Sequence, residues 1–167
     1  MTSTARNTNM NLGSIAGTGF MRSGDENHAD RVLREMRELG ASPYSMNRFE
    51  SRYLPRIVHP DEHIKGVVYG RSKDGSVMLI ATDRRTIYLD KKPFFVSEDE
   101  ITYDIVSGIS YGRSLFSVGI KLHTRIGDYE VRTFNKKCAE GFVEFIESRC
   151  LENHGGTRRI SPVASIR

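Results

Sequence analysis

Two histidines and two acids lie close enough together in the sequence to suggest a metal site. His59 and His63 are four residues apart, with Asp61 and Glu62 between them. On a helix this spacing would bring both imidazoles to one face, as zinc sites require. Pro60 argues against a helix here, and the neighbouring sequence contains no cysteine or further histidine. We therefore predict no metal site and no cofactor.

A nucleophile is the second kind of chemistry that the sequence could supply. Cys138 follows Lys137 near the start of a predicted helix, a position that can lower the pKa of a thiol. A catalytic thiol also needs a base within hydrogen-bond reach, and the sequence offers no marked candidate. Cys150 lies about 18 Å further along the same helix, too far away for a disulfide. We therefore predict a non-enzymatic protein with two thiols, placed in the cytoplasm because the N-terminus lacks a secretory pattern.

Basic side chains around the predicted turns are the third candidate set. The formal net charge of +4 permits contact with nucleic acid or an anionic membrane, although Lys and Arg are interspersed with Asp and Glu throughout the chain. The alternative interpretation of these residues is solvated loop charge. The candidate binding residues are Lys65, Arg71, Lys73, Arg84, Arg85, Lys91 and Lys92. No residue set identifies a small-molecule substrate.

One turn combines a hydroxyl, a carboxylate and two arginines. Thr82 and Asp83 can accept hydrogen bonds from nearby backbone N–H groups and so stabilise a tight connection. Arg84 or Arg85 could pair with the Asp83 carboxylate. We favour a structural role for this turn over a ligand-binding role.

The elements that must position these residues begin after an N-terminal tail. Residues 1–25 are rich in Ser, Thr, Asn and Gly, and residues 153–167 contain two adjacent arginines, so we expect a disordered tail at each end, the second of them basic. No apolar run approaches the roughly 20 residues of a membrane-spanning helix. The 167 residues suit one domain with appendages.

Residues 26–54 have the pattern of a helical hairpin arm. A first stripe recurs at helical spacing, Ser42 and Pro43 mark the start of a second helix, and Pro55 ends it. The apolar positions are Val32, Leu33, Met36, Leu39, Met46, Phe49 and Tyr53. This stripe must pack on the outside of the following domain or on another chain. A barrel exterior is normally polar, which favours another chain.

From His63 the apolar period changes to two, and near residue 139 it returns to the helical period. The predicted strands lie at 64–71, 77–81, 86–89, 94–96, 101–111, 116–122 and 129–131, with an interruption at 97–100. The run at 77–81 is apolar enough to be buried on both faces. A closing helix carries Ala139, Phe142, Val143, Ile146 and Cys150 on one stripe. We predict a mainly β fold of the α+β class: a curled antiparallel barrel of six to seven strands capped by a C-terminal helix.

This order of elements resembles the pleckstrin-homology (PH) superfold, and local motifs resemble the bacterial PH-like families, the YokE-like group in particular. The motifs lie at 59–64 (HPDEHI), 80–89 (IATDRRTIYL), 101–109 (ITYDIVSGI) and 134–146, where FNKK precedes Phe142, Phe145 and Ile146. The resemblance covers about residues 54–151 and implies a PH-like domain at 55–152. It implies a binding module and no particular reaction. In eukaryotic PH domains that bind phosphoinositides, basic residues lie on the first two strands, where Lys65, Arg71 and Lys73 fall here with a different spacing.

Two functions follow as expectations. The first is a non-enzymatic binding or scaffolding module that acts through protein–protein association, self-association included, because the edges of an incompletely closed sheet favour strand addition. The alternative is a peripheral protein that binds an anionic membrane or nucleic acid through its basic turns and tail.

Overall fold

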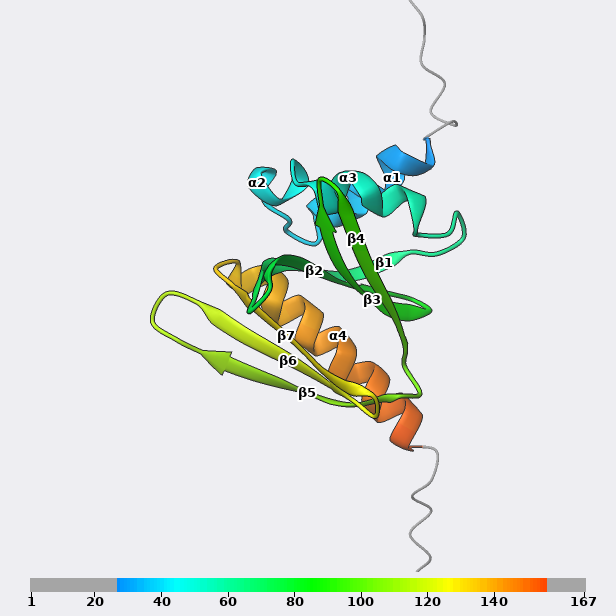
Figure 1. Ribbon diagram of the computed structural model, residues 1–167. Helices are drawn as coiled ribbons and strands as arrows, with labels where there is room; N and C mark the ends of the chain where they lie inside the picture. Colours follow the sequence, from blue (N-terminus) through cyan, green and yellow to red (C-terminus); the bar gives the residue numbers. More distant parts are fainter. Residues whose placement is uncertain (1–26, 156–167) are drawn as a thin grey trace, which may run out of the picture.

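A computed structural model describes residues 27–155 of the chain, which hold four α-helices, a short 3-10 helix and seven strands (Figure 1). The helices are α1 (His28–Glu38), α2 (Pro43–Met46), α3 (Phe49–Tyr53), the 3-10 helix η1 (Leu54–Arg56) and α4 (Lys136–Gly155). The strands are β1 (Ile64–Ser72), β2 (Gly75–Thr82), β3 (Arg85–Lys92), β4 (Phe95–Thr102), β5 (Val106–Arg113), β6 (Val118–Thr124) and β7 (Gly127–Thr133). Helix α4 extends into the predicted C-terminal tail, and the rest of both predicted tails lies outside the described residues.

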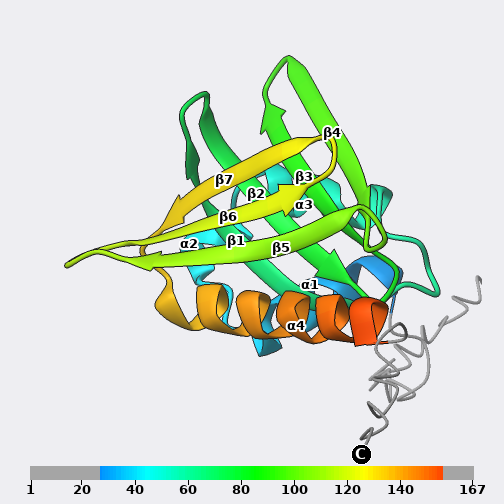
Figure 2. The same cartoon turned by 90° about the horizontal axis from the view of Figure 1, so that it is seen from below.

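The seven strands form one antiparallel sheet in the order β4-β3-β2-β1-β7-β6-β5. The sheet curls over α4 but does not close, so β4 and β5 are its two edges (Figure 2). This confirms the predicted fold class, with an open sheet in place of a closed barrel. No helix in the described range is long and apolar enough to cross a membrane.

The predicted interruption at residues 97–100 is wrong. All four residues belong to β4 and pair with β3, and the chain turns instead after Thr102, before β5 begins at Val106. The acidic residues are tolerated because β4 is an edge strand, where charged side chains reach solvent and discourage unwanted pairing.

The inner core lies between the concave face of the sheet and α4. Phe142 and Ile146 of α4 are fully buried against strand residues from both halves of the sheet. Gly66 of β1 makes this approach possible, because a Cβ there would lie 3.1 Å from Phe142 Cα and Cδ2. The stripe predicted for the closing helix therefore faces the core.

A second core lies on the convex face of β1–β3, beneath the N-terminal helices (Figure 1). Val32 and Met36 of α1 are fully buried there with Met78 and Ile80 of β2. The apolar stripe thus packs on the sheet of its own chain, and the expectation that another chain covers it is wrong. Alternate residues of β2 face the two cores, which is why its apolar run is continuous.

The second predicted helix is broken in two. It splits between α2 and α3 at Asn47 and Arg48, and η1 completes the segment. This break rotates the predicted stripe, so that Phe49 is half exposed while Glu50 and Ser51 are buried.

Candidate functional site

The turn between β2 and β3 is a structural centre. Thr82 Oγ1 accepts hydrogen bonds from the backbone N–H groups of Arg84 and Arg85, at 3.1 and 3.0 Å, which confirms the predicted role of this hydroxyl. It also donates to Glu62 Oε1 at 2.7 Å. The carboxylate of Asp83 accepts a hydrogen bond from the backbone of His63.

The guanidinium of Arg85 is held within this turn by partners of its own chain. Its Nε lies 3.0 Å from Glu62 Oε1, its Nη2 donates to the carbonyl of Ile57, and its Nη1 pairs with Glu100. Burial alone would raise the pKa of Glu62, but hydrogen bonds from Arg85, the His59 backbone and Thr82 lower that pKa overall. Arg85 thus pairs with Glu62 and Glu100, and not with Asp83 as the sequence suggested.

Arg84 and the histidines also serve local structure. Arg84 donates to the carbonyl of Asp61, and His63 Nδ1 lies 2.8 Å from Glu35 Oε1. His59 Nδ1 lies 3.7 Å from Asp61 Oδ2. Across residues 27–155, no three or more His, Cys, Asp or Glu residues are grouped so that they could hold a metal ion.

Cys138 is buried at the start of α4 and accepts a hydrogen bond from Asn135 Nδ2 at 3.1 Å. Its Sγ lies 3.4 Å from the carbonyl of Leu39. Burial raises the pKa of this thiol, with Lys137 only partly opposing the effect. Such a thiol is protonated at neutral pH and therefore a weak nucleophile.

The remaining predicted basic residues fall into separate places. Lys65 is exposed near the C-terminal end of α1. Lys91 Nζ lies 5.5 Å from the centroid of the Tyr53 ring, and Lys92 Nζ lies 3.0 Å from Asp90 Oδ2. Arg71 and Lys73 alone share one surface hollow, on the first hairpin.

That hollow adjoins the junction of β1 and β7, where the two halves of the sheet meet. The junction has a single register pair, Arg71 opposite Arg132. Gly70 allows the close approach, because a Cβ there would lie 2.4 Å from the carbonyl oxygen of Arg132. Like charges placed directly opposite each other destabilise an antiparallel pair, and neither guanidinium has an ion pair with a carboxylate of the described residues. The two arginines therefore place positive charge at the junction without stabilising the fold through an ion pair.

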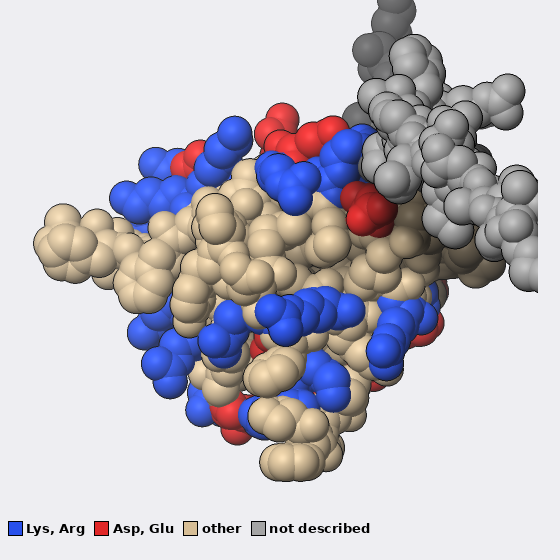
Figure 3. Space-filling model, turned by 90° about the horizontal axis from the view of Figure 1, so that it is seen from above, with Lys and Arg blue, Asp and Glu red and all other residues tan. Residues whose placement is uncertain are grey.

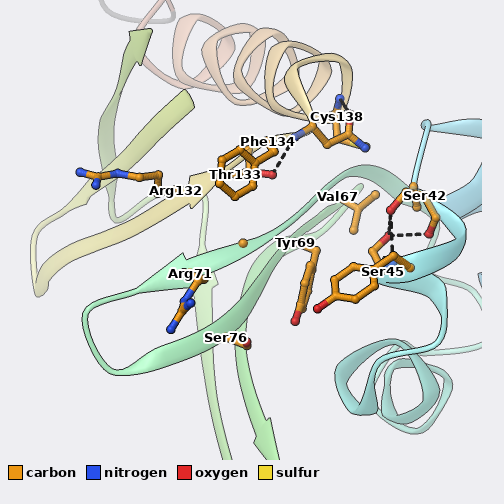
Figure 4. A pocket seen from close by; sticks show the side chains of 14 residues that line it. Ser42, Ser45, Val67, Tyr69, Arg71, Ser76, Arg132, Thr133, Phe134 and Cys138 are labelled. Carbon is orange, nitrogen blue, oxygen red and sulfur yellow. Dashed lines mark hydrogen bonds between the residues drawn. The ribbon is translucent and has the colours of Figure 1, made fainter. Parts of the chain in front are cut away.

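An apolar groove of about 330 Å³ opens on one side of this arginine pair (Figure 4). Its floor includes Val67 and Tyr69 of β1, and its walls come from the α1–α2 connection, α2 and the segment between β7 and α4. None of the fourteen residues that line it is acidic. Phe134 contributes an exposed ring to one wall.

Two aromatic rings in mutual contact, Tyr44 of α2 and Tyr69 of the floor, also line the groove. Tyr44 and Tyr69 meet edge to face with centroids 6.1 Å apart, and the guanidinium of Arg48 lies 5.4 and 5.5 Å from the two ring centroids. Such contacts fix the orientation of the rings. Tyr44, Tyr69 and Arg48 therefore form one connected group beside the groove.

A second hollow, of about 620 Å³, opens on the other side of the arginine pair. Arg71 and Arg132 line both cavities, and Lys73 and Lys121 join them in the second. Lys121 pairs with Glu130, the acidic residue of this hollow. An apolar groove and a basic hollow thus meet at the two arginines. We call this combination the junction site.

Sequence reasoning found Arg71 and Lys73 but missed Tyr44, Tyr69 and Arg132. Arg132 is distant from Arg71 in the sequence and is placed opposite it by the β1–β7 register, and Tyr44 reaches β1 through its ring contact with Tyr69. Tyr69 is close to Arg71 in the sequence, but no local pattern marked it as part of a groove. The local signal available was Gly70, whose presence inside a strand indicates a close backbone approach.

The chain folds into a small domain of one curled β-sheet, with a groove beside the β1–β7 junction. The model of the bacterial PH domain family matches residues 58–148, and the chain therefore belongs to this family. A solved structure to which the chain is similar is the crystal structure of a DUF1696 family protein with a pleckstrin-homology domain from Shewanella loihica PV-4. It is 17% identical, with 60% of this chain and 93% of that chain covered and a TM-score of 0.44. No curated protein matches the chain.

Proposed function

We propose that this chain is a non-enzymatic binding module that holds an acidic segment of a partner protein at the junction site. The observation that carries the proposal is the position of Arg71 and Arg132. These two residues are opposite each other in the strand register, have no ion pair with a carboxylate of the described residues, and lie beside an apolar groove with no acidic lining residue. Membership of the bacterial PH domain family agrees with a binding role.

Charge favours an acidic ligand. A carboxylate placed between two exposed guanidinium groups can accept charge-assisted hydrogen bonds, which are stronger than neutral ones. It would also offset the two positive charges that the register places on opposite residues of β1 and β7. Two copies of this site facing each other would bring like charges together, so a different protein is favoured over a second copy.

The groove favours an apolar side chain beside the acidic group. Its volume of about 330 Å³ is at the small end of ligand cavities, enough for a large side chain and its backbone. Rings from Tyr69 and Phe134 face that volume from two sides. A short segment with one apolar residue next to acidic residues fits both halves of the site.

The alternative that the basic turns bind a membrane or nucleic acid has less support. Arg84 and Arg85 donate to carbonyl and carboxylate oxygens of their own chain, and Lys92 pairs with Asp90. These turns therefore do not present one common basic face. Within the family, the motifs at 59–64 and 80–89 support placement in the YokE-like group. The lack of a disulfide among the described residues supports a cytoplasmic location.

Fluorescence anisotropy with a labelled pentapeptide, one phenylalanine flanked by glutamates, tests the proposal. We expect Arg132→Glu and Tyr69→Ala to weaken binding at least about tenfold, the effect of losing roughly 1.4 kcal/mol. The control Lys65→Glu makes the same charge change away from the site and should alter Kd less than about twofold, since a distant exposed charge is screened. Equal loss in the control, or equal binding of a lysine-flanked peptide, would overturn the proposal.

A further inference from the structure

The turn between β5 and β6 carries solvent-exposed apolar side chains. Leu115 is 79% exposed and Phe116 is 75% exposed. The pairing of Val118 with Thr133 brings Phe134, itself 77% exposed, beside this turn. The hairpin projects beyond the rest of the molecule at the left of Figures 1 and 3. We call these three residues the apolar tip.

We propose that the apolar tip inserts into the interfacial region of an anionic lipid bilayer. Phe134, Arg71 and Arg132 also line the junction site, whereas Leu115 and Phe116 lie outside it. The test below therefore changes only Leu115 and Phe116 at the tip.

Cationic side chains stand directly behind the tip. Arg113 is the last residue of β5, and Arg132 and Arg71 are paired neighbours one step further from the turn. Lys136 and Lys137 begin α4, next to Phe134 in the chain, and all five of these cations are exposed. Figure 3 shows basic side chains on both sides of the projection. Apolar side chains in front of cations match the order of an anionic membrane, with acyl chains beneath phosphate and carboxylate groups.

The shape of the tip favours a bilayer over a protein. A convex turn with three large side chains offers far less than the roughly 1,000 Å² that a specific protein interface buries. A bilayer needs no complementary pocket, and each inserted side chain gains by leaving water. Arg113 pairs with Glu140 at 2.8 Å, which offsets both charges. The cationic surround of the tip therefore consists of Arg71, Arg132, Lys136 and Lys137.

The turn between β3 and β4 is a natural comparison. Phe94 is 102% exposed there, and Lys91 and Lys92 precede it. However, Lys92 Nζ is engaged by Asp90 and by the carbonyl of Asp74, and Lys91 lies over the Tyr53 ring. These lysines are held by their own chain, so this turn lacks the cationic surround of the apolar tip.

Co-sedimentation of the full chain with vesicles of 30% phosphatidylserine in phosphatidylcholine tests the inference. We expect binding at about 50 mM salt, where screening is weak, and less binding to pure phosphatidylcholine. The double variant Leu115→Ser/Phe116→Ser should reduce partitioning at least about tenfold, while Phe94→Ser should change it less than about twofold. The inference is overturned if the native chain does not bind anionic vesicles, or if Phe94→Ser causes the same loss as the double variant.

A second readout exploits the lack of tryptophan in the sequence. Phe116→Trp should show a blue shift of emission with anionic vesicles and quenching by brominated lipids, and Phe94→Trp should show neither. An unshifted Phe116→Trp spectrum in the presence of bound protein would place another surface on the membrane and refute the tip. Pentapeptide binding measured without lipid is unaffected by either result, so failure here and failure of the proposed function are distinguishable.

Discussion

Removal of the Phe142 ring tests whether α4 closes the inner core. The side chain is fully buried, and it packs against Gly66 of β1, which has no side chain to move into the space. A Phe→Ala change at a buried site costs about 3–5 kcal/mol, and more where the surroundings cannot collapse. We therefore expect the upper part of this range for Phe142→Ala, or a fall in Tm of roughly 10–20 °C.

Urea unfolding followed by far-ultraviolet circular dichroism measures this change. Phe134→Ala is the matched control, because its ring is 77% exposed and its loss should change the free energy of unfolding by less than about 0.5 kcal/mol. Gly66→Ala adds a sharper test, since the new methyl group would crowd the Phe142 ring but would partly fill the space left by Phe142→Ala. The double variant should be less destabilised than the sum of the single variants. A cost below about 1 kcal/mol for Phe142→Ala would refute the role assigned to α4.

Four further predictions concern the second core, the two buried acids and the arginine pair. Met36→Ala should lower the free energy of unfolding by about 2–5 kcal/mol without changing the mass measured by light scattering, because the stripe of α1 packs on its own sheet. Burial and a neighbouring aspartate raise the pKa of Glu50, so its contribution to stability is lost as pH rises through that raised value, and Glu50→Gln should stabilise the protein at neutral pH. The pKa of Glu62 is lowered, so its pH dependence has the opposite sign: its contribution to stability is lost as pH falls through the pKa in the folded protein. Glu62→Gln should therefore destabilise the protein at neutral pH. The Glu50 and Glu62 variants are both measured as Tm against pH. Arg132→Glu should raise the free energy of unfolding by about 0.2–1 kcal/mol, because it converts a like-charge pair with Arg71 into an attractive pair, even though it removes peptide binding.

Most of the fold was predictable from local patterns. Alternation of apolar residues located the strands, and the helical period located α4 and the buried face that includes Phe142 and Ile146. The placement of α1 was also within reach, because the run at 77–81 is apolar at every position and so requires cover on both faces of β2. The prediction that another chain covers the stripe followed instead from the general rule that a barrel exterior is polar, and it ignored the apolar run at 77–81.

The junction site was only half predictable, for a physical reason. Arg71 and Lys73 stand out because they flank a recognisable turn, whereas Arg132 acquires its importance from being opposite Arg71 in the β1–β7 register. Register between strands distant in sequence depends on tertiary packing, which no local pattern encodes. Phe116 shows the same limit: its alternation predicted a strand position, but it precedes β6 and its ring is exposed.

A map of where an acidic peptide contacts the protein tests whether the junction site is the binding surface. Backbone amide chemical shifts of the full chain are followed by NMR while the glutamate-flanked phenylalanine pentapeptide is added, and again with a lysine-flanked peptide. We expect the largest shifts to cluster at Tyr69, Arg71, Arg132 and Phe134 with the acidic peptide only. Shifts centred on another surface, or the same shifts with the basic peptide, would contradict it.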